Sequence, residues 1–236
     1  MSDFSGKTVV VTGAAGGLGQ NIAAHFRSQG ANLALVDYSD ELLKNAFSDG
    51  ESDTQLLVAC DLTNRESTSE GFKKIIQKFN RIDVLANIAG GFVMGEEVHE
   101  TSDKTWDFLF NLNTRSIMNT AAAAVPVMLE QGGGKIINVS AVSSQKGSAQ
   151  QGVYIASKSA VSRLTETMAD ELRDKNINVN AIMPSIIDTP TNRQSMPNAD
   201  YSKWVKPEQL ASVVAFLASD ASVAVHGAGI PVVGLS

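Results

Sequence analysis

Short apolar segments alternate with longer amphipathic segments along the whole chain. Runs of mainly apolar residues, several of them rich in β-branched side chains, predict strands at residues 7–12, 32–36, 55–59, 83–86, 135–139, 178–182 and 230–233. Between them, apolar residues recur with helical spacing and predict helices at residues 18–29, 41–47, 65–79, 103–130, 155–175 and 207–219. In the first of these helices Leu18, Ile22 and Phe26 share one face, and Gly30 follows as a terminating residue.

The regular order of strands and helices predicts the fold class. Strands that are apolar throughout are typical of a parallel sheet covered on both faces. Right-handed crossovers place the connecting helices on both sides of such a sheet. We therefore expect an α/β fold built as a three-layer, doubly wound parallel sheet. No linker rich in Pro, Gly or Ser divides the chain, so we expect residues 1–236 to form one domain.

Residues 188–206 are the least regular part of the chain. They contain Met196, Tyr201 and Trp204 as well as two prolines. The segment reads either as a surface loop or as a mobile flap over a site. We favour the flap, and with it a substrate-loop region, because the segment follows the carboxyl end of a predicted strand, where ligand sites of α/β sheets lie.

Charge and cysteine content exclude several classes of protein. The chain of 236 residues carries 19 Lys and Arg against 25 Asp and Glu, a net charge of −6. This balance argues against a nucleic-acid or anionic-membrane partner, and no apolar run is long enough to span a bilayer. Cys60 is the single cysteine, and the N-terminus lacks the apolar core of a signal peptide. We expect a cytoplasmic protein.

The histidines His25, His99 and His226 lack ligand spacing, so we expect no metal.

The first predicted strand leads into a glycine-rich loop and then a helix. Gly13, Gly17 and Gly19 permit a tight turn and close backbone approach, while the helix N-terminus offers free N–H groups to a phosphate. The second strand ends at Asp37, 18 residues after Gly19, where a carboxylate suits a ribose 2′-hydroxyl. A 2′-phosphate would meet like charge there. The sequence therefore predicts NAD rather than NADP as the cofactor.

A tyrosine and a lysine are spaced one helical turn apart. Tyr154 and Lys158 share one face of the predicted helix. An ammonium group beside a phenol favours the phenolate, so we expect Lys158 to lower the pKa of Tyr154. A tyrosine tuned in this way can pass a proton to or from a carbonyl or hydroxyl oxygen.

Together these motifs are specific, because they occur in a fixed order over nearly the whole chain. They are Thr12-Gly13-x3-Gly17-x-Gly19, Asp61-Leu62, Asn87-Ile88-Ala89-Gly90, Asn113 and Tyr154-x3-Lys158. In this set the chain resembles the short-chain dehydrogenase/reductase family, in its single-domain branch. The resemblance implies a Rossmann-type sheet of about seven strands with the cofactor at its carboxyl edge.

The resemblance also implies roles for individual residues. Asp61 and Leu62 would contact the adenine, Asn113 would hold a water, and Lys158 would bond the nicotinamide ribose. The remaining residues expected at the cofactor are Gly13, Gly17, Leu18, Gly19, Asp37, Asn87, Ala89, Gly90, Tyr154, Pro184, Ile187 and Thr189. The expected catalytic set is Tyr154, Lys158, Asn113 and Ser140.

One departure from the family pattern concerns the catalytic serine. The family places it about thirteen residues before the tyrosine, where this chain has Ala141. Ser140 precedes that position and Ser143 follows it by two residues, and a small shift of the loop could present either hydroxyl. Ser140 needs such a shift because neighbouring side chains of a strand point to opposite faces, whereas Ser143 would point to the same side as Ala141 only if the strand continued that far. Loss of such a donor costs about 10²–10³-fold in rate.

Three functions are compatible with these residues. The preferred hypothesis is an NAD-dependent oxidoreductase that interconverts a secondary alcohol and a carbonyl compound, with Tyr154 as general acid or base. The alternative is a non-catalytic dinucleotide-binding homologue, a sensor or assembly subunit, and a less favoured third is an isomerase or dehydratase at the same site. The family resemblance further implies a homo-oligomer, a dimer or tetramer, formed through the helices around residues 106–129 and 155–175.

Overall fold

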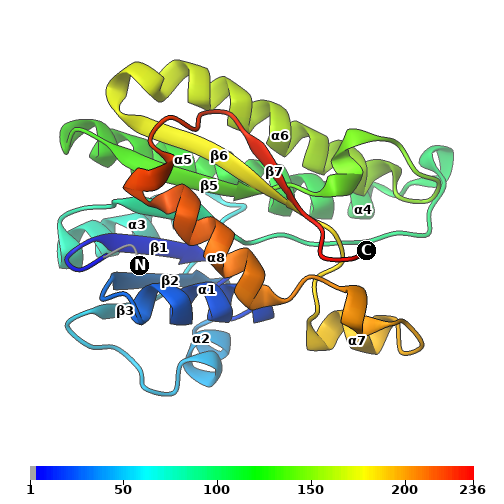
Figure 1. Cartoon of the computed structure of the whole chain (residues 1–236), viewed down its shortest axis with the longest axis horizontal. Helices are drawn as coiled ribbons and strands as arrows, with labels where there is room; N and C mark the ends of the chain where they lie inside the picture. Colours follow the sequence, from blue (N-terminus) through cyan, green and yellow to red (C-terminus); the bar gives the residue numbers. More distant parts are fainter. Residues whose placement is uncertain (1–3) are drawn as a thin grey trace.

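A computed structural model describes residues 4–236 and shows a parallel sheet between two layers of helices (Figure 1). The strands are β1 (Thr8–Thr12), β2 (Asn32–Asp37), β3 (Gln55–Ala59), β4 (Val84–Asn87), β5 (Gly134–Val139), β6 (Ile177–Pro184) and β7 (Gly229–Val232). The helices are α1 (Gly17–Arg27), α2 (Asp40–Ala46), α3 (Arg65–Phe79), α4 (Asp103–Phe110), α5 (Ser116–Glu130), α6 (Gly152–Leu172), α7 (Pro190–Ser195) and α8 (Pro207–Ala218). The predicted α/β class, a doubly wound Rossmann-type sheet, is confirmed.

The seven strands are ordered β3-β2-β1-β4-β5-β6-β7, and all their pairings are parallel. The chain builds outward from β1 in one direction and then resumes beside β1 with β4. The order therefore reverses between β1 and β4. At such a point the loops after the two strands diverge to opposite sides of the sheet and leave a crevice at the carboxyl edge.

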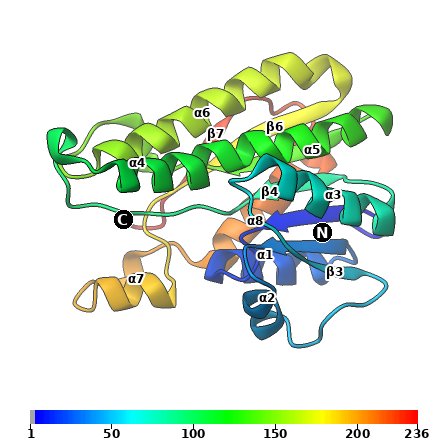
Figure 2. The same ribbon diagram turned by 180° about the vertical axis from the view of Figure 1, so that it is seen from behind.

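Two apolar clusters occupy the two faces of the sheet. Along β1, Val9 and Val11 join the cluster that contains α1 and α8, whereas Val10 joins the cluster that contains α3 and α5. This division is the two-residue period of a strand, which sends successive side chains to opposite faces. Figure 2 shows α5 and α6 running side by side over the second face. All five residues of β1 are buried, which fits its composition of three valines between two threonines, all β-branched.

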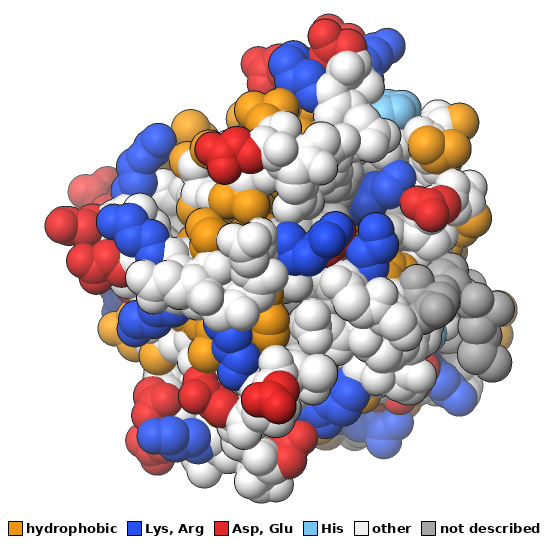
Figure 3. All heavy atoms as spheres, turned by 90° about the vertical axis from the view of Figure 1, so that its left-hand side faces the viewer, with side chains coloured by type: hydrophobic (Ala, Val, Ile, Leu, Met, Phe, Trp, Pro, Cys, Tyr) orange, Lys and Arg blue, Asp and Glu red, His pale blue; other side chains and the backbone are white. Residues whose placement is uncertain are grey.

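The amino ends of the strands form the opposite end of the molecule from the crevice. There Asp83 accepts hydrogen bonds from the backbone N–H of Thr8 at 2.8 Å and from the guanidinium of Arg81. Figure 3 shows basic and acidic side chains interspersed over this end. Among residues 4–236 no helix combines the length and apolar composition that a bilayer crossing requires.

The single helix predicted at residues 103–130 is interrupted. Residues Asn111–Arg115 form a π-helical turn between α4 and α5. The wider turn adds a residue relative to α-helical spacing, which changes the faces on which the side chains around it lie. Asn113, in the middle of the turn, is fully buried and faces α6. Hydrophobic spacing does not reveal such a turn, because the apolar pattern continues on both sides of it.

The irregular segment at residues 188–206 has more structure than the sequence predicts. It contains α7 and a short 3₁₀ turn at Tyr201–Lys203, and Trp204 and Val205 are buried at its end. The backbone of Val205 bonds to Ile186 and Asp188. The segment therefore leaves and re-enters the fold at one place, and α7 lies apart from the sheet in both views (Figures 1 and 2).

Candidate cofactor and catalytic site

The glycine-rich loop after β1 is packed too closely for side chains. A Cβ on Gly13 would lie 2.8 Å from the Cα of Ala89, and Gly13 has φ of 61°. A Cβ on Gly19 would lie 2.2 Å from the carbonyl oxygen of Gly13. The first glycine therefore permits the turn against the loop after β4, and the last permits α1 to begin against the turn. The N-terminus of α1, at Gly17, adjoins this loop, as the sequence predicts.

Asp37 lies at the end of β2 and is held by two backbone donors. Its Oδ2 accepts from the N–H of Ala15 at 2.9 Å, and its Oδ1 accepts from the N–H of Tyr38 at 2.8 Å. The first bond ties the carboxylate to the glycine-rich loop. The side chain is thus fixed beside the loop rather than used to cap α2, whose cap is Ser39.

A cavity of about 430 Å³ opens beside Asp37. It brings together five residues that the sequence assigns to the cofactor, namely Gly13, Asp37, Asp61, Leu62 and Ala89. It also includes residues that the sequence analysis does not predict, namely Tyr38, Cys60, Thr63, Asp107, Phe108, Asn111 and Leu112. The first three are sequence neighbours of Asp37, Asp61 and Leu62, so the motifs themselves indicate them. The last four come from α4 and the π-helical turn, which only the tertiary structure brings here.

Asn87 supports the sheet below this cavity. It is buried, its Nδ2 donates to Asn138 at 2.9 Å, and its Oδ1 accepts from Thr120 at 2.9 Å. The next two backbone N–H groups, those of Ile88 and Ala89, donate to the hydroxyl of Thr12 at 3.0 and 3.1 Å. These bonds fix the loop after β4 against β1, so the positions of Ala89 and Gly90 follow from buried polar contacts.

Lys158 and Asn113 meet at Gly90. A Cβ on Gly90 would lie 3.0 Å from Oδ1 of Asn113 and 3.1 Å from Nζ of Lys158. Lys158 is only 5% exposed, and its ammonium group donates to the carbonyl of Val139 at 2.8 Å. The amide of Asn113 donates to the hydroxyl of Ser157 at 3.0 Å. Three elements, namely α6, the π-helical turn and the loop after β4, therefore meet at one polar centre.

Burial determines the protonation of both members of the Tyr154–Lys158 pair. It raises the pKa of Tyr154 to about 12 and lowers the pKa of Lys158 to about 8. Burial is the cause of both shifts, and it moves the pKa of Tyr154 in the direction opposite to the lowering expected from Lys158. At neutral pH the phenol keeps its proton.

Ser140 occupies a different environment from the one the sequence suggests. It is 2% exposed, and its hydroxyl donates to the carbonyl of Lys158 at 2.9 Å and lies 2.8 Å from the hydroxyl of Ser162. These bonds argue against Ser140 as the hydroxyl that contacts a substrate. They make it a support for α6, since Val139 and Ser140 together hold both the ammonium group and the carbonyl of Lys158.

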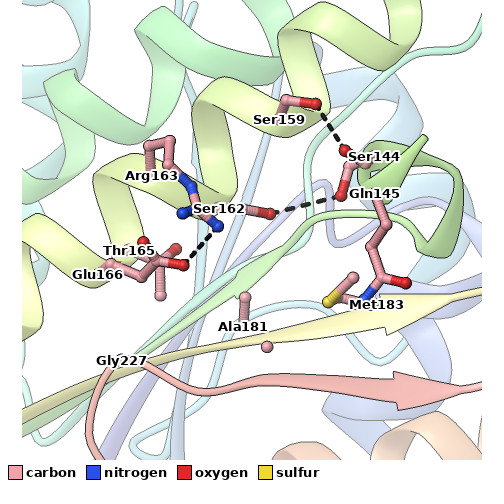
Figure 4. A pocket seen from close by; sticks show the side chains of 11 residues that line it. Ser144, Gln145, Ser159, Ser162, Arg163, Thr165, Glu166, Ala181, Met183 and Gly227 are labelled. Atoms are coloured by element: carbon pink, nitrogen blue, oxygen red, sulfur yellow. Dashed lines mark hydrogen bonds and ion pairs between the residues drawn. The ribbon is translucent and has the colours of Figure 1, made fainter. Parts of the chain in front are cut away.

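The serine cluster around Ser140 continues into a second cavity. Ser144 and Ser162 line this space of about 490 Å³ between α6 and the strands β6 and β7, and Ser159 donates to the carbonyl of Ser144 at 2.8 Å (Figure 4). The cavity lies along the middle of α6 and does not include Tyr154 or Lys158. Ala141, at the position of the family's serine, is buried and offers no hydroxyl.

The remaining predicted residues lie along the loop after β6 or in the core. Thr189 lies beside the N-terminus of α1, since a Cβ on Gly17 would be 3.4 Å from its methyl group. Pro184 ends β6, and the carbonyl of Ile187 accepts from Asn192 at 2.8 Å. Leu18 is buried in the core, so only its backbone is available to a ligand. Among residues 4–236 no group of three or more His, Cys, Asp or Glu side chains is arranged to hold a metal ion.

Comparisons with known proteins agree with this arrangement. Residues 7–200 match the short chain dehydrogenase family. The chain is 34% identical over 237 residues to the 3-oxoacyl-acyl-carrier-protein reductase FabG of Thermotoga maritima, covering 95% of each chain. It is 31% identical to an uncharacterised oxidoreductase of Staphylococcus aureus strain USA300, covering 87% of this chain and 91% of the relative.

Solved structures show the same fold at lower identity. A short-chain type dehydrogenase/reductase of Mycobacterium ulcerans superposes with a TM-score of 0.92 at 26% identity, covering 99% of this chain and 90% of the other. Carveol dehydrogenase of Mycobacterium avium, in complex with NAD, superposes with a TM-score of 0.88 at 25% identity, covering 99% and 98%. The chain thus belongs to the short-chain dehydrogenase family and is an oxidoreductase homologue.

Proposed function

We propose that this protein is an NAD-dependent oxidoreductase that interconverts a secondary alcohol and a carbonyl compound. The observation that carries the proposal is that Lys158 and Asn113 both approach Gly90. A Cβ placed on Gly90 would lie within 3.1 Å of Nζ of Lys158 and of Oδ1 of Asn113. Both side chains are buried, and they converge on the loop that also lines the cavity beside Asp37. A buried lysine without a carboxylate partner is costly, which favours a role in chemistry over a structural one.

Proton transfer falls to Tyr154. With its pKa raised to about 12, the phenol is neutral at pH 7 and can donate a proton to a carbonyl oxygen as negative charge develops there. When bound, the nicotinamide supplies or accepts the hydride. Lys158, with a pKa lowered to about 8, keeps its charge below that pH and stabilises the phenolate that remains after donation. Asn113 positions the loop at Gly91, with which it exchanges two hydrogen bonds.

The proposed preference for NAD rests on Asp37. Its carboxylate is held beside the glycine-rich loop by the bonds from Ala15 and Tyr38, where it can accept from a ribose hydroxyl. A 2′-phosphate at this place would meet a charge that is not free to turn away, since both oxygens are bound. The residues at the loop fit a dinucleotide, and the complex of carveol dehydrogenase with NAD supports this choice of cofactor.

The alanine at position 141 should lower the rate of the proposed reaction without changing the type of reaction. Ala141 removes one hydrogen-bond donor to the substrate oxygen, so we expect turnover below that of a serine-containing site by about 10²–10³-fold. Substituting Ala141→Ser tests this expectation. A rise in kcat supports it, and an unchanged kcat indicates that another hydroxyl, such as that of Ser143, already supplies the donor.

Turnover of NADH with Tyr154→Phe as the comparison tests the function. The substrates are a cyclic ketone, a hydroxylated ketone and a 3-oxoacyl thioester, the last because of the activity named for the Thermotoga relative. We expect turnover of at least one class and a loss of about 10²-fold or more in the variant. NADH binding by the variant, followed by fluorescence, confirms that the site is intact. Tight NADH binding without Tyr154-dependent turnover on any class would refute the enzyme and support the sensor.

We also propose that the protein acts in the cytoplasm as a homo-oligomer. Exposed apolar side chains on the outer helices support self-association, among them Trp106 on α4 and Met118 and Leu129 on α5. The one cysteine, Cys60, is buried and free, which fits a reducing compartment. Light scattering after gel filtration measures the oligomer, and a monomer at micromolar concentration would contradict this part of the proposal.

A further inference from the structure

An exposed aromatic side chain covers Tyr154, the proposed proton donor. The rings of Phe92 and Tyr154 meet edge to face, with centroids 4.7 Å apart and an interplanar angle of 86°. Phe92 is 54% exposed, so part of its ring contacts Tyr154 and the rest faces solvent beside it. An exposed aromatic ring packed against the ring of the proposed proton donor offers a surface on which an apolar group of a substrate can bury itself.

The backbone before Phe92 is fixed. The N–H of Gly91 donates to Oδ1 of Asn113 at 2.8 Å, and Nδ2 of Asn113 donates to the carbonyl of Gly91 at 3.1 Å. A Cβ on Gly91 would lie 2.7 Å from the ring of Phe108. The loop therefore passes between Asn113 and Phe108, and its two hydrogen bonds to Asn113 give Phe92 a defined starting position.

The backbone after Phe92 is fixed as well. The N–H of Gly95 donates to the carbonyl of Gln150 at 2.9 Å. The carboxylate of Glu96 accepts from the N–H of Ser102 at 3.2 Å and from the hydroxyl of Thr105 at 3.0 Å. Residues 92–94 thus bridge two anchors, so the surface beside Tyr154 exists before a ligand binds and loses little entropy when one does.

The side chains on this bridge are all apolar. The side chains of Phe92, Val93 and Met94 carry no strong donor or acceptor. Met94 is nearly as exposed as Phe92 and has a flexible thioether that adapts to a ligand. A hydroxyl-rich substrate would turn polar groups toward this surface and leave them without partners. An aliphatic or alicyclic group has no hydrogen bonds to lose when it packs against this surface.

We propose that Phe92 is a specificity-determining residue, and that the substrate carries an apolar ring or alkyl group beside its carbonyl carbon instead of a hydroxylated chain. This inference rests on the proposed function, because it takes Tyr154 as the proton donor. It adds to that function the class of substrate and the residue that selects it.

The first experiment compares two ketones that differ in polarity. We measure kcat/KM with NADH for cyclohexanone and dihydroxyacetone in the wild type, Phe92→Ala and Phe216→Ala. Phe216 is a matched control, since it is 43% exposed and lies on α8, on the opposite face of the sheet. We expect the wild type to favour cyclohexanone. Phe92→Ala should lower kcat/KM for cyclohexanone about tenfold and change kcat/KM for dihydroxyacetone by no more than about twofold. Phe216→Ala should leave both kcat/KM values unchanged.

The second experiment separates this inference from the proposed function. Cyclohexanone is titrated into the NADH complexes of Tyr154→Phe and of Tyr154→Phe with Phe92→Ala, and NADH fluorescence reports the Kd. An increase of about tenfold on removal of Phe92 supports the inference even where turnover is absent and the proposed function fails. The inference would be overturned in this experiment by equal Kd values for the two variants or by no measurable affinity for cyclohexanone. In the first experiment it would be overturned by a higher wild-type kcat/KM for dihydroxyacetone, or by an equal loss of kcat/KM with both ketones in Phe92→Ala.

Discussion

The burial of Lys158 predicts an unusual dependence of stability on pH. Its pKa falls from the ordinary value of 10.5 to about 8 because the ammonium group is shielded from solvent. One pKa unit corresponds to about 1.4 kcal/mol, so keeping the charge buried at neutral pH costs about 3 kcal/mol of folding free energy. Lys158→Met removes that cost and leaves the carbonyl of Val139 without its donor, a loss of about 1–3 kcal/mol.

The two effects separate when pH is varied. Between pH 8 and 10.5 the unfolded chain holds the lysine proton that the folded chain has released, so the stability of the wild type rises with pH. The variant lacks this contribution. At pH 7 we therefore expect the variant to equal the wild type or exceed it by up to about 2 kcal/mol. Toward pH 10 the wild type should gain about 2–3 kcal/mol on the variant.

Urea unfolding at several pH values between 7 and 10, at one protein concentration, measures this difference. Other groups titrate in the same range, but they are common to both proteins and cancel in the comparison. Lys104→Met provides the matched control, since Lys104 is exposed near the start of α4. A difference between wild type and Lys158→Met that stays flat from pH 7 to 10 would refute the argument that burial controls Lys158.

Two further substitutions test the site, and a third tests the segment at residues 188–206. Asp37→Asn should raise the ratio of kcat/KM for NADPH over NADH at least about tenfold, because it removes a fixed charge from the place of a 2′-phosphate; an unchanged ratio in steady-state assays counts against this assignment. Ser140→Ala should destabilise the fold by about 1–3 kcal/mol in urea unfolding while keeping at least a tenth of kcat, since its hydroxyl supports the carbonyl of Lys158; a loss as large as that of Tyr154→Phe would instead make Ser140 a substrate contact. Tyr201→Phe should speed limited proteolysis within residues 190–203 several-fold, because the hydroxyl closes this segment through the carbonyl of Pro197 at 2.9 Å; an unchanged cleavage rate would show that the bond adds nothing.

Local patterns were sufficient to predict most of the elements. The strand predicted at residues 55–59 and the helix predicted at residues 65–79 have the same bounds in the structure. These patterns succeed because strands of a parallel sheet covered by helices are mainly apolar, and a helix on a sheet must repeat apolar residues with its own period. The glycine-rich loop could also be predicted from the sequence, because the backbone around Gly13 and Gly19 leaves no space for a side chain at either position.

Residues close together in the chain were sufficient to predict the fold class, the order of its elements and the glycine-rich loop. Packing of the elements, in contrast, set which side chains share an environment. It turned Ser140 toward the carbonyl of Lys158, widened one turn of helix at Asn113 and placed Phe92 against Tyr154. It also decided that burial governs the pKa values of Tyr154 and Lys158. Solvent exposure depends on every element packed around a group, and no spacing along the chain encodes it.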